Sequence, residues 1–265
     1  MSKIIDCHCH IYPDKIAAKA VESIGKFYDL PMRYNGTASQ MISESRKAGI
    51  TGSVVFSVAT TPHQVASINN FIADEVKKEP SLCGLGAAHP LSEDQKADID
   101  GIVSLGLKGV KLHPDIQGFA IDDPRCMEIY RLCRERGLTV LIHMGDKRYD
   151  FSSPKRLIPV LEQLDGLKII GAHLGGWGIW KDAESVLSGY DNFSVDCSSS
   201  LAFLPPEEAK RIIRLYGANR VLFGTDYPMW DYNAELERFF ALGLSDEERE
   251  LILHRNAEEI FDIEG

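Results

Sequence analysis

The sequence lacks an excess of basic residues and any long apolar run. Its 265 residues include 29 Lys and Arg against 39 Asp and Glu, so the formal net charge is -10. Nucleic acids and anionic membranes are bound through basic surfaces, and this balance argues against both as partners. No apolar run approaches the ~20 residues of a membrane span, and the residues before Ile4 do not resemble a targeting peptide. We therefore expect a cytoplasmic protein that binds neither nucleic acid nor a membrane.

Cysteine pairs at metal-binding spacing are also missing. The six cysteines are scattered, without a repeated CxxC, at Cys7, Cys9, Cys83, Cys126, Cys133 and Cys197. One Cys-His-Cys-His run occurs at residues 7–10, but no second pair at zinc-finger spacing accompanies it. We interpret the cysteines as reduced thiols, and not as a disulfide framework or a zinc finger.

Short apolar runs alternate with helical patterns along the whole chain. The runs are typical of strands buried on both faces of a parallel sheet. They lie near 3–5, then at 53–58, 82–88, 108–113, 138–143, 167–173, 192–197 and 220–226. Eight such units in 265 residues predict an α/β fold, namely a single-domain (β/α)8 TIM barrel spanning residues 1–265.

Two segments fall outside this alternation. Residues 14–36 make a long excursion between the first two strands, with a helical pattern followed by a loop. Long excursions of this kind are often functional lids, so we expect one here. Residues 233–262 are expected to form two C-terminal helices, interrupted near Gly243 and Ser245, that close the barrel.

Histidines gather at the predicted carboxyl ends of the strands, where barrel enzymes form their active sites. Seven of the eight lie at or just beyond such ends: His8, His10, His63, His89, His113, His143 and His173. A single histidine there would more often be a hydrogen-bonded core or loop residue. Strand alternation puts Asp6, His8 and His10 on one face and Cys7 and Cys9 on the other. So many imidazoles at one rim favour a metal-dependent site.

These residues stand in motifs that resemble a known family. The motifs are Asp6-x-His8-x-His10, Gly109-Val-Lys111-Leu-His113-Pro114, Leu141-Ile-His143, Ala172-His173-Leu-Gly-Gly176 and Phe223-Gly-Thr-Asp226-Tyr-Pro228. As an ordered set they resemble the amidohydrolase superfamily, specifically its amidohydrolase-2 branch. That branch contains amidohydrolases and lactonases beside decarboxylases similar to aminocarboxymuconate semialdehyde decarboxylase. The resemblance extends from Asp6 to Asn256-Ala257.

The resemblance implies roles for the rim residues. It makes His8, His10, His143 and Asp226 the ligands of one divalent metal ion, with zinc as the expected ion. A bound zinc ion lowers the pKa of water to roughly 7, and Asp226 would take the proton of that water. His173 would be an acid/base or a ligand of a second metal.

Lys111 admits two interpretations. In binuclear members of the family, a lysine on the fourth strand carries a carbamate that bridges two metals, so Lys111 is a third catalytic candidate beside Asp226 and His173. Its Lys-x-His-Pro context looks more like the mononuclear branch. The alternative is an ammonium group paired with Asp196 or Asp226.

Three residues are candidates for substrate binding. Arg148 follows His143, and a guanidinium suits a carboxylate, although a solvated loop residue would look the same. His113 ends the fourth strand, and Trp177 follows the sixth, where it could line a pocket or pack a loop. The leading function is hydrolysis of a small amide, lactone or ester-like substrate. The alternative is decarboxylation of a small unsaturated or aromatic acid, for which we would expect an arginine beside the metal. Dimers are common among such barrels, but no segment of the sequence identifies an interface.

Overall fold

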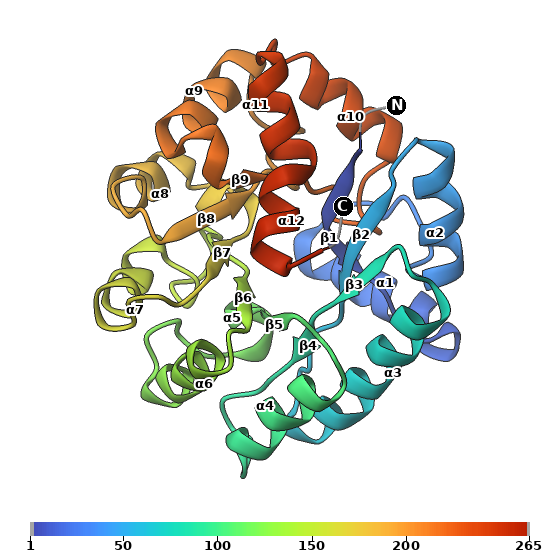
Figure 1. Ribbon diagram of the computed structural model, residues 1–265, viewed down its shortest axis with the longest axis vertical. Coiled ribbons are helices and arrows are strands. Elements are labelled where there is room, and N and C mark those ends of the chain that lie inside the picture. Colours follow the sequence, from blue (N-terminus) through green and yellow to red (C-terminus); the bar gives the residue numbers. More distant parts are fainter. Residues whose placement is uncertain (1–2, 264–265) are drawn as a thin grey trace.

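Parallel strands form the centre of the molecule and helices surround them (Figure 1). The structure is a computed structural model and describes residues 3–263. Its strands are β1 Ile5–His10, β2 Gly52–Phe56, β3 Leu82–Gly84, β4 Gly86–Ala87, β5 Gly109–Leu112, β6 Thr139–Ile142, β7 Ile169–Gly171, β8 Phe193–Asp196 and β9 Val221–Leu222. Each of the predicted strands is present.

The strands are arranged in chain order and the barrel closes. One set runs β1-β2-β3 and the other β4-β5-β6-β7-β8-β9, with every pair parallel. Only Leu85 separates β3 from β4, and its N–H still donates to Val55 O of β2 at 2.9 Å. At the remaining seam, Cys7 N donates to Phe223 O at 2.8 Å, beyond the end of β9. The predicted (β/α)8 barrel is therefore confirmed.

Helices follow the strands as the alternation predicts. They are α1 Asp14–Tyr28, α2 Ala38–Lys47, α3 Val65–Lys78, α4 Gln95–Ser104, α5 Pro114–Gln117, α6 Pro124–Glu135, α7 Ile158–Gln163, α8 Trp180–Leu187, α9 Pro206–Tyr216, α10 Tyr232–Phe240, α11 Asp246–Glu250 and α12 Asn256–Phe261. The Asp94 carboxylate caps α4 by accepting from Ala97 N. A π-helical turn, Leu251–Arg255, joins α11 to α12. None of the helices in the described range is long and apolar enough to cross a membrane.

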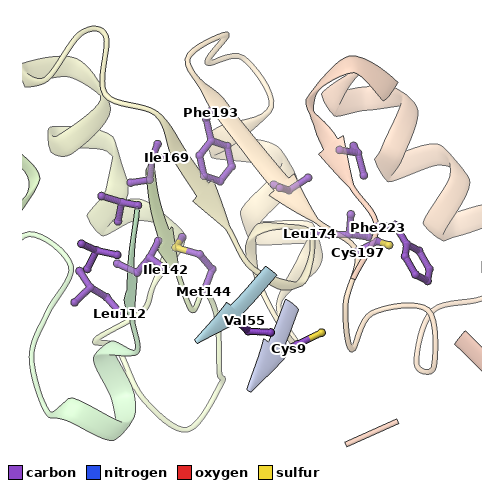
Figure 2. Close-up of a cluster of buried hydrophobic side chains, with 14 of the residues drawn as sticks. Cys9, Val55, Leu112, Ile142, Met144, Ile169, Leu174, Phe193, Cys197 and Phe223 are labelled. Atoms are coloured by element: carbon purple, nitrogen blue, oxygen red, sulfur yellow. The ribbon is translucent and has the colours of Figure 1, made fainter. Parts of the chain in front are cut away.

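Apolar side chains fill two regions of the barrel. One cluster packs between the strands and the outer helices, and Figure 2 shows Leu112, Ile142 and Phe193 within it. A second cluster fills the barrel interior with side chains from several strands, and Ala257 and Phe261 of α12 pack against it. In Figure 1, α12 lies across the near end of the barrel. The amino-terminal end is thus filled, and the carboxyl ends of the strands remain for the polar residues.

The prediction for the first strand is wrong in one respect. The pairing register of β1 with β2 shifts between Asp6 and Cys9, so strict alternation breaks there. Cys7 packs in the interior cluster, whereas Cys9 packs in the outer cluster (Figure 2). Asp6 does not join His8 and His10, because its carboxylate accepts from Thr225 N at 2.9 Å and from the Thr225 hydroxyl. Asp6 therefore fixes the segment that leads to Asp226.

The close approach of β5 and β6 generates a prediction about Gly109. A Cβ at this position would lie 2.2 Å from Thr139 O, in a backbone that cannot retreat. We expect Gly109→Ala to lower the free energy of unfolding by about 3 kcal/mol. A Cβ added at Gly101 in α4 would meet no atom within 4 Å. Gly101→Ala should therefore raise the free energy of unfolding by up to ~1 kcal/mol. Urea denaturation of both variants measures these changes, and equal stabilities would contradict the packing described for β5.

Candidate active site

A cavity of about 730 Å³ lies at the carboxyl ends of the strands. The polar residues that line its floor come from five different strand ends: His10, His113, His143, His173 and Asp226. Side chains of α1 and of the first half of α3 form its walls. The segment predicted as a lid, 14–36, thus contributes α1 to the cavity, while its movement remains a prediction.

Three ligand atoms converge at the end of β1. His8 Nε2 lies 3.3 Å from His10 Nε2 and 3.5 Å from Asp226 Oδ1. The same carboxylate oxygen is 3.7 Å from His10 Nε2. The second oxygen of Asp226 accepts from Ser199 Oγ at 2.5 Å, which holds the carboxylate in this orientation. The structure therefore brings His8, His10 and Asp226 together, as the metal-ligand prediction requires.

Asp196 determines which nitrogen of His8 faces this group. His8 Nδ1 lies 2.9 Å from Asp196 Oδ2, and both residues are buried. A carboxylate can only accept, so Nδ1 carries the proton and Nε2 presents its lone pair. Burial lowers the pKa of His8 well below its ordinary value, with the neighbouring Lys111 as the next cause. Burial likewise lowers the pKa of His10, so both rings are neutral ligands at neutral pH.

His143 and His173 have the same kind of anchoring. The outer nitrogen of each donates to a carbonyl, His143 Nε2 to Gly145 O and His173 Nδ1 to Ser198 O, each at 3.0 Å. The inner nitrogens, His173 Nε2 and His143 Nδ1, face each other at 3.0 Å. Two lone pairs at this distance repel unless a cation or a proton lies near both. The His173 ring centre is 5.0 Å from that of His8, which joins this pair to the first group.

This donor set fits a divalent metal ion. Neutral imidazole nitrogens and carboxylate oxygens are ligands of zinc and manganese, and buried partners hold them in the required tautomers. His143 contacts His173 and lies outside the tight group of His8, His10 and Asp226. His8 and His173 also share a second group with Asp196. The four imidazoles therefore form one continuous row around the end of the barrel.

Lys111 lies behind this row. It is fully buried, and its Nζ is 3.3 Å from His8 Nε2 and 4.9 Å from the centre of the Phe56 ring. Desolvation lowers the pKa of Lys111 to about 8, although Asp196 and Asp226 oppose that shift. Within residues 3–263, neither carboxylate forms an ion pair with it, so the simple paired ammonium does not describe this residue. The bridging carbamate stays a prediction.

The three substrate-binding candidates lie in different surroundings. Arg148 is not among the described residues that line the cavity. Its Nη2 instead donates to Asp146 Oδ2 at 2.6 Å. His113 does line it and stacks on His143, with ring centres 3.9 Å apart. The Trp177 ring packs edge-on against Tyr28 at 5.2 Å, outside the lining. Only His113 is therefore placed to meet a ligand directly.

Comparisons with known proteins agree with this geometry. A model of the amidohydrolase family, amidohydrolase-2, matches residues 5–263. The chain belongs to the amidohydrolase-2 family. It is 26% identical over 204 residues to the 2-amino-3-carboxymuconate-6-semialdehyde decarboxylase of Dictyostelium discoideum, a match that covers 61% of this chain and 55% of that protein. The chain thus spans about half the length of this curated relative.

Two solved structures show the same fold with different activities. A 5-carboxyvanillate decarboxylase from Novosphingobium aromaticivorans, complexed with manganese, has a TM-score of 0.78 at 17% identity, covering 98% of this chain and 96% of that one. A probable 2-pyrone-4,6-dicarboxylic acid hydrolase from Acinetobacter baumannii has a TM-score of 0.71 at 18% identity, covering 98% and 99%. The structural neighbours of this chain thus include a decarboxylase and a probable hydrolase, and the decarboxylase is complexed with manganese.

Sequence reasoning assigned no site role to Asp196 or Tyr28. Asp196 stood at a predicted strand end, which was a usable signal. The Tyr28 hydroxyl lies 2.7 Å from His113 Nε2, and His113 Nδ1 accepts from Ile116 N. His113 Nε2 therefore donates to Tyr28, whose own proton is left to donate to a ligand in this amidohydrolase cavity. No local pattern links a tyrosine on α1 to that rim.

The tautomer argument predicts the effect of Asp196→Asn. The amide can turn its NH2 group toward His8 Nδ1. Nδ1 would then accept, and the ring proton would move to Nε2, which could no longer bind the metal. We expect the affinity for zinc to fall about 10- to 100-fold, measured by competition with a chromophoric chelator at neutral pH. Asp191→Asn, on the exposed turn before β8, is the control and should keep wild-type affinity. Equal affinity in the two variants would contradict the role of Asp196.

Proposed function

We propose that the chain hydrolyses a small, neutral amide, lactone or ester-like substrate in this cavity. The observation that carries the proposal is the position of Asp226. Its Oδ1 lies against the inward nitrogens of His8 and His10 and borders a cavity whose described lining contains no arginine. Lys19 is the only Lys or Arg among the described lining residues, and it is exposed. An anionic substrate would lack a guanidinium partner at this site.

One divalent cation, with zinc as our choice, would be held by His8, His10, His143 and Asp226. His173 would lie beside it. Such a cation supplies Lewis acidity and lowers the pKa of water to about 7. A second metal on a carbamylated Lys111 is the alternative arrangement. The buried position of Lys111, without a carboxylate partner in the described residues, is compatible with either form.

The protein's own groups divide the proton transfers. Ser199 donates to one oxygen of Asp226, and the other, which lies beside His8 and His10, would take a proton from the attacking water and pass it to the leaving group. The Tyr28 hydroxyl can donate to the carbonyl oxygen of the substrate as negative charge develops there. His173 has an unprotonated nitrogen toward the cluster and can orient the water.

Decarboxylation is the second candidate, because the curated relative and several structural neighbours are decarboxylases. Such a substrate carries a carboxylate, and a bidentate arginine is its usual partner. Arg148 is the arginine nearest to this role in the sequence, but Asp146 and the carbonyl of Phe27 already occupy its guanidinium. This favours the hydrolase.

The test compares both reactions on zinc-loaded protein. We expect release of acid from δ-valerolactone and no release of CO2 from 2,6-dihydroxybenzoate. Asp226→Asn should lower kcat for the lactone by about 10²- to 10⁴-fold, with metal content measured on the same sample. Asp165→Asn, exposed before β7, should keep wild-type kcat. CO2 release without lactone hydrolysis would replace the hydrolase by the decarboxylase.

A further inference from the structure

Helix α1 presents an apolar stripe to the cavity, and only Phe27 at its end also stacks on another ring, that of Tyr149, among the described residues. Ile16, Ala20, Ile24 and Phe27 recur at helical spacing and all four line the cavity. Only Ala17 of this 15-residue helix is buried, and Ile16 is 51% exposed. An amphipathic helix normally buries such a stripe against the core. Here the stripe faces an open space.

The part of the cavity lining that comes from α3 is also mainly apolar. Ile68 and Phe71 of α3 line the cavity and are only half-buried. Val58, beyond the end of β2, lines the cavity with them. We call the space between the α1 stripe and these three residues the apolar channel. Partly exposed apolar surface that lines a concave site marks a binding surface.

The apolar channel is continuous with the candidate metal cluster. One cavity is lined both by the α1 stripe and by His10, His143 and Asp226. Apart from Asp226, no carboxylate lines it within residues 3–263, and Lys19 is its one ammonium group. Its volume of about 730 Å³ exceeds what a small lactone ring fills and lies in the range that takes drug-sized ligands.

We propose that the apolar channel holds an alkyl or aryl chain of the substrate, so that the substrate is a neutral lactone, ester or amide with an apolar chain of several carbons. This inference rests on the proposed function and specifies its substrate class. The chain would lie between α1 and α3 while the reacting carbonyl lies at Asp226. A second copy of the protein could cover α1 instead, but it would not reach the cluster at the floor of the same cavity.

A binding experiment tests the inference without turnover. The ligands are cyclohexanones with a methyl, butyl or heptyl group on carbon 2, neutral rings that cannot be hydrolysed. Calorimetry on the zinc-loaded enzyme should show affinity rising about threefold for each added methylene. Ala20→Phe should fill the apolar channel and cut the gain from methyl to heptyl at least tenfold. Ala18→Phe, on the exposed face of the same helix, is the matched control and should keep the full gain.

The outcomes separate this inference from the proposed function. Affinity that does not depend on chain length overturns the inference even if δ-valerolactone is hydrolysed. A gain that Ala20→Phe and Ala18→Phe reduce equally also overturns it, because the apolar channel would then not be where the chain binds. A gain lost only in Ala20→Phe, with no lactone hydrolysis, supports the apolar channel and overturns the hydrolase. If sedimentation shows a dimer that Ile16→Asp dissociates, α1 is an interface and the inference fails.

Discussion

The hydrogen bond between Asp196 and His8 is the interaction on which the candidate site depends. Asp196 is fully buried, and a buried carboxylate is costly unless its oxygens are satisfied. One oxygen accepts from His8, and the other accepts from the backbone of His173 and of Ser198. A single carboxylate on β8 therefore orients His8 within β1 and His173 just after β7. Without it, the inward lone pairs that make the cluster a metal site would not be fixed.

The barrel places the hydrogen bond between Asp196 and His8, and the cluster around it, at one end of the molecule. Apolar side chains and α12 fill the interior below the cluster, and the cavity lined by α1 and α3 opens onto its polar groups. Burial keeps His8, His10 and His143 neutral, because it lowers the pKa of each. The same fold thus supplies ligand atoms at the floor of the cavity and apolar walls above it.

Much of this organisation could be predicted from the sequence, because strand ends in a parallel barrel must meet at one rim. The histidines and Asp226 follow from that rule. The sequence could not predict that Cys7 and Cys9 pack in different clusters, because the register shift in β1 arises from its pairing with β2. Arg148 was proposed for a substrate, yet Asp146, two residues earlier, already satisfies its guanidinium. Tyr28 reaches His113 from another element, and only the packed structure shows such a contact.

The central claim is that the imidazole cluster and Asp226 hold one divalent cation. The most direct measurement is the metal content per chain of protein purified without added metal, together with the His8→Ala and Lys111→Ala variants. The account predicts close to one equivalent in the wild type, loss in His8→Ala and retention in Lys111→Ala. Two equivalents, with one lost in Lys111→Ala, would contradict the single-metal site. No metal in the wild type, even after reconstitution with zinc or manganese, would contradict the claim itself.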